Sequence, residues 1–127
     1  MDQIRVRTQD APFTRRQVPI PHLQVAATSS GTADTLTTVR TGVVLQIKRL
    51  KVANITGTAA NLSINSIPSG GAIGDGNAEC RDLSIPANSN VDLTDLVGQL
   101  YEAGTVIKAY SGTTNALVLS GWAEEIL

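Results

Sequence analysis

The sequence predicts an all-β protein: a small antiparallel β-sandwich with an extended N-terminal arm. Its 127 residues fit a single domain that can bury a core without covalent staples. Short runs of alternating apolar and polar residues recur about every eight to twelve residues, with glycine, proline or asparagine between them. No helical pattern alternates with these runs, which argues against a parallel sheet. The pattern is typical of a sandwich of about six or seven short strands.

The arm is predicted over residues 1–24. This segment contains Pro12, Pro19 and Pro21, and because proline lacks a backbone donor and fixes φ, we expect neither a helix nor a central strand there. Residues 26–38 show no clear helical period and are interpreted as a linker or a loosely held edge. The sequence therefore predicts an arm and linker over residues 1–40 and a sandwich body over residues 41–127.

The first body strand contains a slip in its alternation. Val43, Leu45 and Ile47 share one face, but Leu50 continues the apolar series one residue late. In a regular strand Leu50 would point to the opposite face from Ile47. A β-bulge near residues 48–49 would restore a single apolar face, and the alternative is a strand that is covered on both sides.

The rest of the body is predicted from the same alternation and from turn residues. The glycine-rich stretch 68–77 is expected to form a long loop. Asp95 is placed to cap a short helix that runs through Leu100 and is weakened by Gly98. Further strands are predicted around residues 61–65, 83–85, 91–93, 105–110 and 116–126.

Charge is divided unevenly along the chain. Residues 1–51 carry eight Lys and Arg residues and three acids, whereas residues 52–127 carry two and eight, although the net formal charge is only −1. A basic end and an acidic remainder suit copies or partners that associate by charge complementarity, and a role in solubility alone is the alternative. We expect no signal peptide, and no apolar run is long enough for a membrane span.

The residues that could carry catalysis are few. His22 is the only histidine and lies in the proline-rich arm, so we interpret it as a solvated or interface side chain. Cys80, the only cysteine, excludes an internal disulfide and is expected to be a small core or edge residue. Glu124 and Glu125 are adjacent, so on a strand they point to opposite faces and cannot form a carboxylate pair. We therefore expect no catalytic residues and no enzyme.

A metal or phosphate site in the glycine-rich region is also considered. Asp75, Glu79 and Asp82 could gather around a hard cation, but their spacing matches no calcium-binding loop. The glycines are followed by neither Gly-Lys-Ser/Thr nor a predicted helix, so they are not expected to bind phosphate. The prediction is no metal and no cofactor.

The chain is instead predicted to bind protein through the arm. Its arginines could contact nucleic-acid phosphates, but the body is acidic and has no aromatic-rich strand face for stacking bases, so an acidic protein surface is favoured. Only four aromatic residues are present in the chain, and Trp122 and Tyr110 are predicted at a subunit interface, with core packing as the alternative for Trp122. The predicted arm contacts are Arg5, Arg7, Phe13, Arg15, Arg16, Val18, Ile20 and Leu23.

Three stretches carry a resemblance to a known group of proteins. They are Ser66-Ile-Pro-Ser-Gly-Gly, Leu83-Ser-Ile-Pro-Ala-Asn-Ser, and Leu100-Tyr-Glu-Ala-Gly-Thr-Val-Ile-Lys-Ala-Tyr. Residues 43–126 resemble small virion structural proteins of tailed bacteriophages, in which an Ile-Pro-Ala-Asn turn precedes a strand and an Ala-Gly-Asp turn leads into the next-to-last strand. Thr105 stands where that pattern more often has Asp, so the match is one of turn pattern.

The resemblance implies a non-enzymatic virion protein. Among such proteins, capsid decoration or cement proteins with a jelly-roll-like body fit the arm best, because extended arms clamp neighbouring subunits. We then expect a homotrimer that binds the major capsid protein on the capsid surface after assembly in the host cytoplasm, with no membrane partner. The alternative is a tail, baseplate or fibre module that binds a host receptor or glycan.

Overall fold

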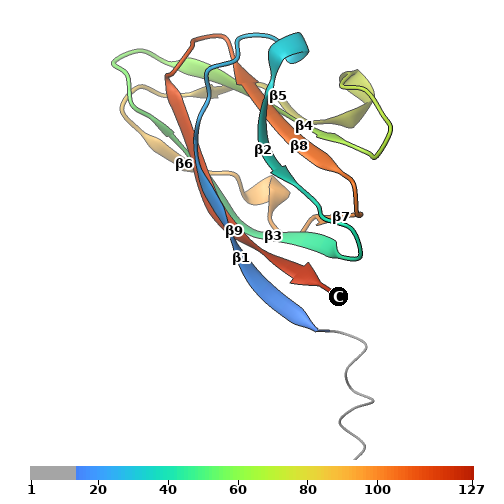
Figure 1. The fold of residues 1–127 in the computed structure, drawn as a ribbon. Coiled ribbons are helices and arrows are strands. Elements are labelled where there is room, and N and C mark those ends of the chain that lie inside the picture. The colour runs from blue at the N-terminus through green and yellow to red at the C-terminus, as the bar shows by residue number, and fades with distance from the viewer. Residues whose placement is uncertain (1–13) are drawn as a thin grey trace, which may run out of the picture.

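The computed structural model describes residues 14–127, which form two antiparallel β-sheets packed against each other (Figure 1). The strands are β1 (Arg15–Gln24), β2 (Asp34–Thr38), β3 (Val44–Asn54), β4 (Ala60–Ile67), β5 (Ala78–Ile85), β6 (Asn90–Asp92), β7 (Leu100–Tyr101), β8 (Val106–Ser111) and β9 (Leu117–Ile126). Three single turns of 3₁₀-helix connect some of them: η2 (Ser30–Thr32), η3 (Asp75–Asn77) and η4 (Thr94–Leu96). The predicted small antiparallel β-sandwich is confirmed.

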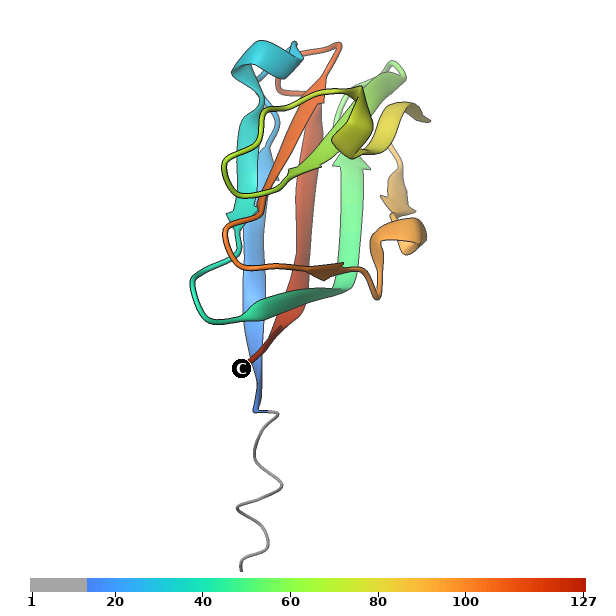
Figure 2. The same ribbon diagram turned by 90° about the vertical axis from the view of Figure 1, so that its right-hand side faces the viewer.

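Each sheet combines strands from distant parts of the chain. The β9 sheet has the order β1-β9-β3-β6, with β7 also pairing with β3, and the β8 sheet has the order β2-β8-β4-β5. Figure 2 shows β1 and β2 along one side of the sandwich and the segment of β6 and η4 along the opposite side. The last strand, β9, therefore lies between the first strand and β3.

The core between the sheets is built almost entirely from aliphatic side chains, as the scarcity of aromatic residues predicts. Among the described residues, Tyr101 is the one aromatic side chain in it. The largest fully buried aliphatic side chains come from both sheets, and they are Val25, Val39, Ile47, Leu50, Val52, Leu62, Ile64, Ile85, Ile107, Leu117 and Leu119. Burial of this apolar surface is the main force that holds the two sheets together.

The slip in the alternation of β3 is a β-bulge. The register between β3 and β9 shifts between Ile47, which pairs with Ala123, and Arg49, which pairs with Trp122. One extra residue, Lys48, is accommodated on β3, so that both Ile47 and Leu50 point into the core and are fully buried. Of the two interpretations of this strand, the bulge is correct.

The predicted boundary at residue 40 does not separate an arm from a body. β1 pairs with β9 along its whole length, and Ile20 is buried in the core with 3% of its surface exposed. Proline is tolerated because β1 is an edge strand, and its register shifts between Ile20 and Leu23. β2 likewise pairs with β8, so residues 15–38 belong to the sandwich. The arm prediction for residues 1–13 lies outside the described residues.

The helix predicted from Asp95 to Leu100 is also wrong. The chain makes one 3₁₀ turn, η4, without a side-chain cap, and then turns sharply at Gly98, which has φ +89°. Backbone bonds hold this segment against β3, because the Gly98 N–H donates to the Ile47 carbonyl at 2.7 Å. Pairing with the sheet therefore replaces the weak local helix.

Backbone geometry explains the residues found at two of the turns that carry the sequence resemblance. Asn88 lies in the left-handed region at φ +52°, which asparagine tolerates, and Ser89 Oγ donates to the Pro86 carbonyl at 2.6 Å. Gly104 has φ +86°, and a Cβ there would overlap the side chain of Ser69. Glycine is thus required twice over at position 104, by its φ and by its close neighbour.

Candidate protein-binding face

The outer face of the β9 sheet carries the one tryptophan. β9 alternates regularly, so Leu119 and Ala123 point into the core while Ser120 and Trp122 point outward. Trp122 is flanked directly on both neighbouring strands, because its Cα partners are Pro19 on β1 and Arg49 on β3. We call this surface, from β1 across β9 to β3, the Trp122 face.

A groove of about 390 Å³ lies on the Trp122 face. The bulge of β1 and the bulge of β3 both border it, so irregularities of the two neighbouring strands shape the groove around the regular strand β9. The residues that line it are Pro19, Ile20, Pro21, His22, Arg49, Lys51, Ser120, Gly121 and Trp122. A half-buried indole beside two prolines offers apolar contact area, and the cations beside it favour a partner that presents carboxylates.

Positive charge dominates the Trp122 face. Three of its four basic side chains form a loose network with two acids: Glu124 lies 3.1 Å from Arg15 and 3.8 Å from Lys48, and Asp92 lies 3.6 Å from Arg49. Lys51 lines the groove. Such half-exposed pairs contribute little to stability, and the excess of cations makes the face suitable for an acidic surface.

Glu125 joins three segments at the end of the sandwich. Arg16 Nη2 donates to Glu125 Oε1 at 2.6 Å, and Arg40 Nε donates to both carboxylate oxygens at 3.0 and 2.9 Å. Burial by itself raises the pKa of Glu125, but the hydrogen bonds and charges of Arg16 and Arg40 outweigh it, so the pKa lies below its ordinary value. This carboxylate ties β1 and the loop between β2 and β3 to β9.

The predicted arm contacts have mostly intramolecular roles. Ile20 belongs to the core, and Val18 and Leu23 pack against it. Arg15 and Arg16 form ion pairs with Glu124 and Glu125 of the same chain, and both keep about half of their side-chain surface exposed. The three apolar positions are therefore not free to bind a partner, which corrects the prediction for them; Arg5, Arg7 and Phe13 lie outside the described residues.

The two aromatic residues predicted at a subunit interface lie on opposite faces of the molecule. Tyr110 is half-buried on β8, where its neighbours Ala109 and Ser111 point inward, so it faces outward from the β8 sheet. Trp122 faces outward from the β9 sheet. One flat interface cannot contain both side chains, so they represent two alternative surfaces.

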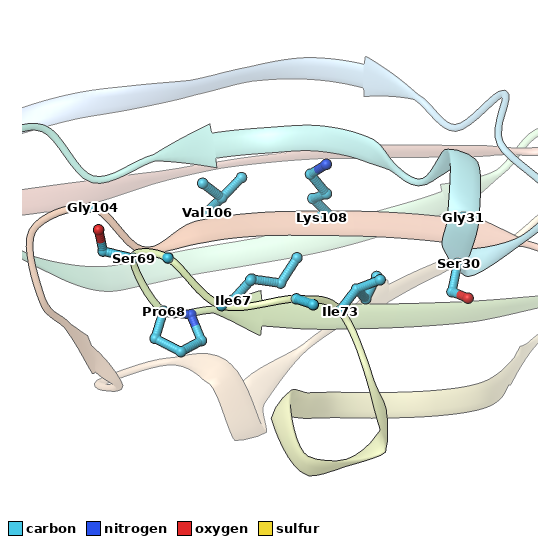
Figure 3. A pocket seen from close by; sticks show the side chains of 12 residues that line it. Ser30, Gly31, Ile67, Pro68, Ser69, Ile73, Gly104, Val106 and Lys108 are labelled. Atoms are coloured by element: carbon cyan, nitrogen blue, oxygen red, sulfur yellow. The ribbon is translucent and has the colours of Figure 1, made fainter.

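A second hollow, of about 360 Å³, lies on the outer face of the β8 sheet (Figure 3). Ile67 of β4 and Val106 and Lys108 of β8 form its floor, and the loop from Pro68 to Ile73 passes beside them, with η2 at one end. Lys108 is the single charged residue among those that line it. A lone cation beside backbone and aliphatic groups supplies neither an acid–base pair nor an activated nucleophile.

The residues considered for chemistry are not brought together. His22 is exposed on β1, and the half-buried Cys80 on β5 donates weakly to the Leu62 carbonyl at 3.7 Å. Burial raises the pKa of Cys80, which disfavours the reactive thiolate. Asp75 is paired with Arg81, and among residues 14–127 no group of three His, Cys, Asp or Glu side chains is arranged to hold a metal ion.

Comparison with known proteins adds no family assignment: no protein-family model and no curated protein matches this sequence. In the described part of the chain, no helix has the length and apolarity needed to cross a membrane.

Sequence reasoning missed four residues that shape these surfaces: Arg40, Arg49, Lys51 and Glu125. Arg49 and Lys51 could have been found, because once a bulge is assumed at residue 48, the alternation places both beside Trp122. No pattern in the sequence indicated that Arg40 and Glu125 would meet. They meet only because β9 returns between β1 and β3, a pairing that local sequence patterns do not show.

Proposed function

We propose that this protein is a non-enzymatic structural protein that binds other proteins within an assembly, through the Trp122 face. The observation that carries the proposal is the groove itself, in which one half-buried indole lies between two prolines and a row of cations. Tryptophan and arginine are the residue types most enriched at the energetic centres of protein interfaces. The partner surface that fits is acidic and presents at least one apolar side chain.

The assembly is proposed to be the virion of a tailed bacteriophage, with this chain as a capsid cement or decoration protein. Support comes from the resemblance of residues 43–126 and from the two turns at Asn88 and Gly104, whose backbone geometry accounts for the shared residues. The order of strands also supports a jelly-roll-like body. In the orders β1-β9-β3-β6 and β2-β8-β4-β5, the chain crosses from one sheet to the other at every connection except β4–β5 and β6–β7, which is compatible with two interleaved Greek keys.

In this role the protein sits on the capsid surface, as a homotrimer, and bridges copies of the major capsid protein. Small bodies of this kind stabilise a shell by burying surface across subunit boundaries, so the number and rigidity of contacts matter more than any one pair. The Trp122 face provides a strand-built surface, which is preorganised and loses little conformational entropy on binding.

The proposal is tested by locating the protein in purified particles. Particles banded on a density gradient from a lysate of the strain that encodes this chain should contain it at a fixed ratio to the major capsid protein. Tail-less heads from a mutant that makes no tails should contain it at the same ratio. Its absence from heads, or its presence only with tails, would exclude the cement role.

A second candidate is a tail, baseplate or fibre module that binds a host receptor or glycan. The observation that favours it is the same open groove, because a tryptophan ring beside polar side chains can stack on a sugar. Titration of oligosaccharides from the host surface, followed by Trp122 fluorescence, distinguishes this role. A saturable change in emission favours the glycan module, and a flat response together with binding to heads favours cement.

A further inference from the structure

The sandwich is open along the side where both sheets end. β5 is the last strand of the β8 sheet and β6 is the last in the path of the β9 sheet, so neither edge is covered by another described strand. Figure 2 shows β6 and η4 along this side, opposite β1 and β2. A cleft of about 200 Å³ lies between β5 and the β6–η4 segment. It is smaller than ligand pockets, which span roughly 300–1,000 Å³, and it suits a few aliphatic side chains.

The floor of this edge cleft is apolar. Leu93 and Leu96 are buried beneath it, Val91 and Cys80 are half-buried, and Leu83 keeps 38% of its surface exposed. Leu83 of β5 and Val91 of β6 both line the cleft, one from each sheet edge. Covering these side chains with aliphatic groups would remove apolar surface from water, which is favourable.

The rim of the edge cleft is acidic. Glu79, Asp92 and Asp95 line it, and no Lys or Arg is among the described residues that do so. Asp92 is 3.6 Å from Arg49 in an exposed pair, and Glu79 accepts a hydrogen bond from Ser66 Oγ at 2.5 Å, so two of the three carboxylates already have a partner on one side. The cleft thus combines apolar contact with negative charge, and the complementary ligand is an extended segment that alternates aliphatic and basic residues.

The chain itself contains such a segment in the part outside the described residues. Residues 4–7 are Ile-Arg-Val-Arg. In an extended chain Ile4 and Val6 point to one side and Arg5 and Arg7 to the other. We propose that residues 4–7 of one copy dock in the edge cleft of a second copy, with the aliphatic side chains on the apolar floor and the guanidinium groups against the rim. This inference rests on the proposed role as a self-associating assembly protein.

The cleft of a second copy is a better docking site for residues 4–7 than the cleft of the same chain. Residue 14 is held at the opposite side of the β9 sheet, where the Leu127 N–H donates to the Thr14 carbonyl at 2.8 Å. β9 and β3 lie between β1 and the cleft of the same chain, and a segment that crossed their outer face would pass Lys48, Arg49 and Lys51, which repel its arginines. A segment from a second copy does not have to cross this basic face.

The single native cysteine makes the contact testable in the full-length chain. Cys80 lines the cleft, so a Val6→Cys variant should form a disulfide with it under mild oxidation when the two segments dock. The reaction is run at alkaline pH, because burial raises the pKa of Cys80. Isotopically labelled and unlabelled copies are mixed beforehand, and mass spectrometry then shows whether the joined peptides come from two copies. Gln9→Cys serves as the matched control in the same segment.

The expected result is a disulfide between position 6 and Cys80 that joins labelled to unlabelled copies. It should form at least about tenfold faster than from position 9, because docking raises the effective concentration of the thiol into the millimolar range. Adding Asp95→Asn should slow it by up to about fivefold, the most that one exposed ion pair contributes, whereas Glu102→Gln, outside the cleft, should not.

Three results would overturn the inference: equal rates from positions 6 and 9, no link to Cys80, or links within single chains only. The assay uses no capsid, so it is independent of the proposed function. If copies cross-link but do not bind to heads, the cement role is contradicted. The contact between copies is still supported in that case.

Discussion

Gly121 of β9 lies directly against the backbone carbonyl of Arg49 on β3, so closely that the methyl group of an alanine would overlap it. The contact arises from the β3 bulge, which pushes the Arg49 carbonyl toward β9 at the place where Leu50 turns back into the core. A glycine on β9 is therefore required for the bulge. The bulge in turn places Arg49 beside Trp122 on the outer face, so the core packing and the candidate binding face depend on the same pair.

The first prediction concerns this pair. Gly121→Ala should lower the free energy of unfolding by about 2–3 kcal/mol, because the new methyl group meets backbone atoms that cannot move without shifting a strand. Chemical denaturation monitored by Trp122 fluorescence measures it. Gly112→Ala is the matched control, since a Cβ there has open space. Equal stability of the two variants would show that the bulge is not as tightly packed as described.

The second prediction tests whether residues 15–24 are a strand of the sandwich or part of a separate arm. Ile20→Ala should destabilise the protein by about 2–4 kcal/mol, because it leaves a cavity in the core, whereas the exposed neighbour Gln17→Ala should change stability little. Deleting residues 1–24 should abolish cooperative unfolding, since it removes the partner of β9, and deleting residues 1–13 removes none of the contacts described above. A fully stable protein without residues 1–24 would restore the arm interpretation.

The third prediction concerns pH. The pKa of Glu125 is lowered in the folded state, so its contribution to stability is fully present above its ordinary value of 4.5 and is lost as pH falls through the lower folded value. At pH 7, Glu125→Gln should reduce the free energy of unfolding by up to about 2 kcal/mol, since each of the two half-exposed pairs contributes roughly 0–1 kcal/mol. The difference from wild type should shrink below about pH 4. A difference that is constant from pH 7 to pH 3 would contradict this assignment.

The alternation of residues predicted most of the fold, because period-two patterning reports directly on which face is buried. It located β3, β4, β6, β8, β9 and the end of β5, and the slip between Ile47 and Leu50 predicted a bulge that the register confirms. It failed at β1, where Val18 and Ile20 also alternate but Pro19 and Pro21 argued against a strand. Edge position, which makes proline tolerable, is a property of the sheet and not of the local sequence.

The candidate site was predictable only in part, for a related reason. Trp122 stood out because tryptophan is rare in this chain, and it does face outward. Its companions come from β1 and β3, and their assembly depends on the insertion of β9 between those two strands. Arg15 and Arg16, predicted to contact a partner, instead pair with Glu124 and Glu125, and this pairing becomes visible only when the register of β1 and β9 is known.

The most direct test of the account compares the two outward-facing aromatic residues as binding surfaces. Heads purified from a mutant that lacks this protein are titrated with wild-type, Trp122→Ala and Tyr110→Ala chains, each first shown to unfold cooperatively, and bound protein is measured by co-sedimentation. Trp122→Ala should raise the Kd by about thirtyfold or more, as expected when a tryptophan at the centre of an interface is removed, and Tyr110→Ala should bind like wild type. Wild-type affinity of the Trp122→Ala chain would contradict the central claim that the Trp122 face is the binding surface.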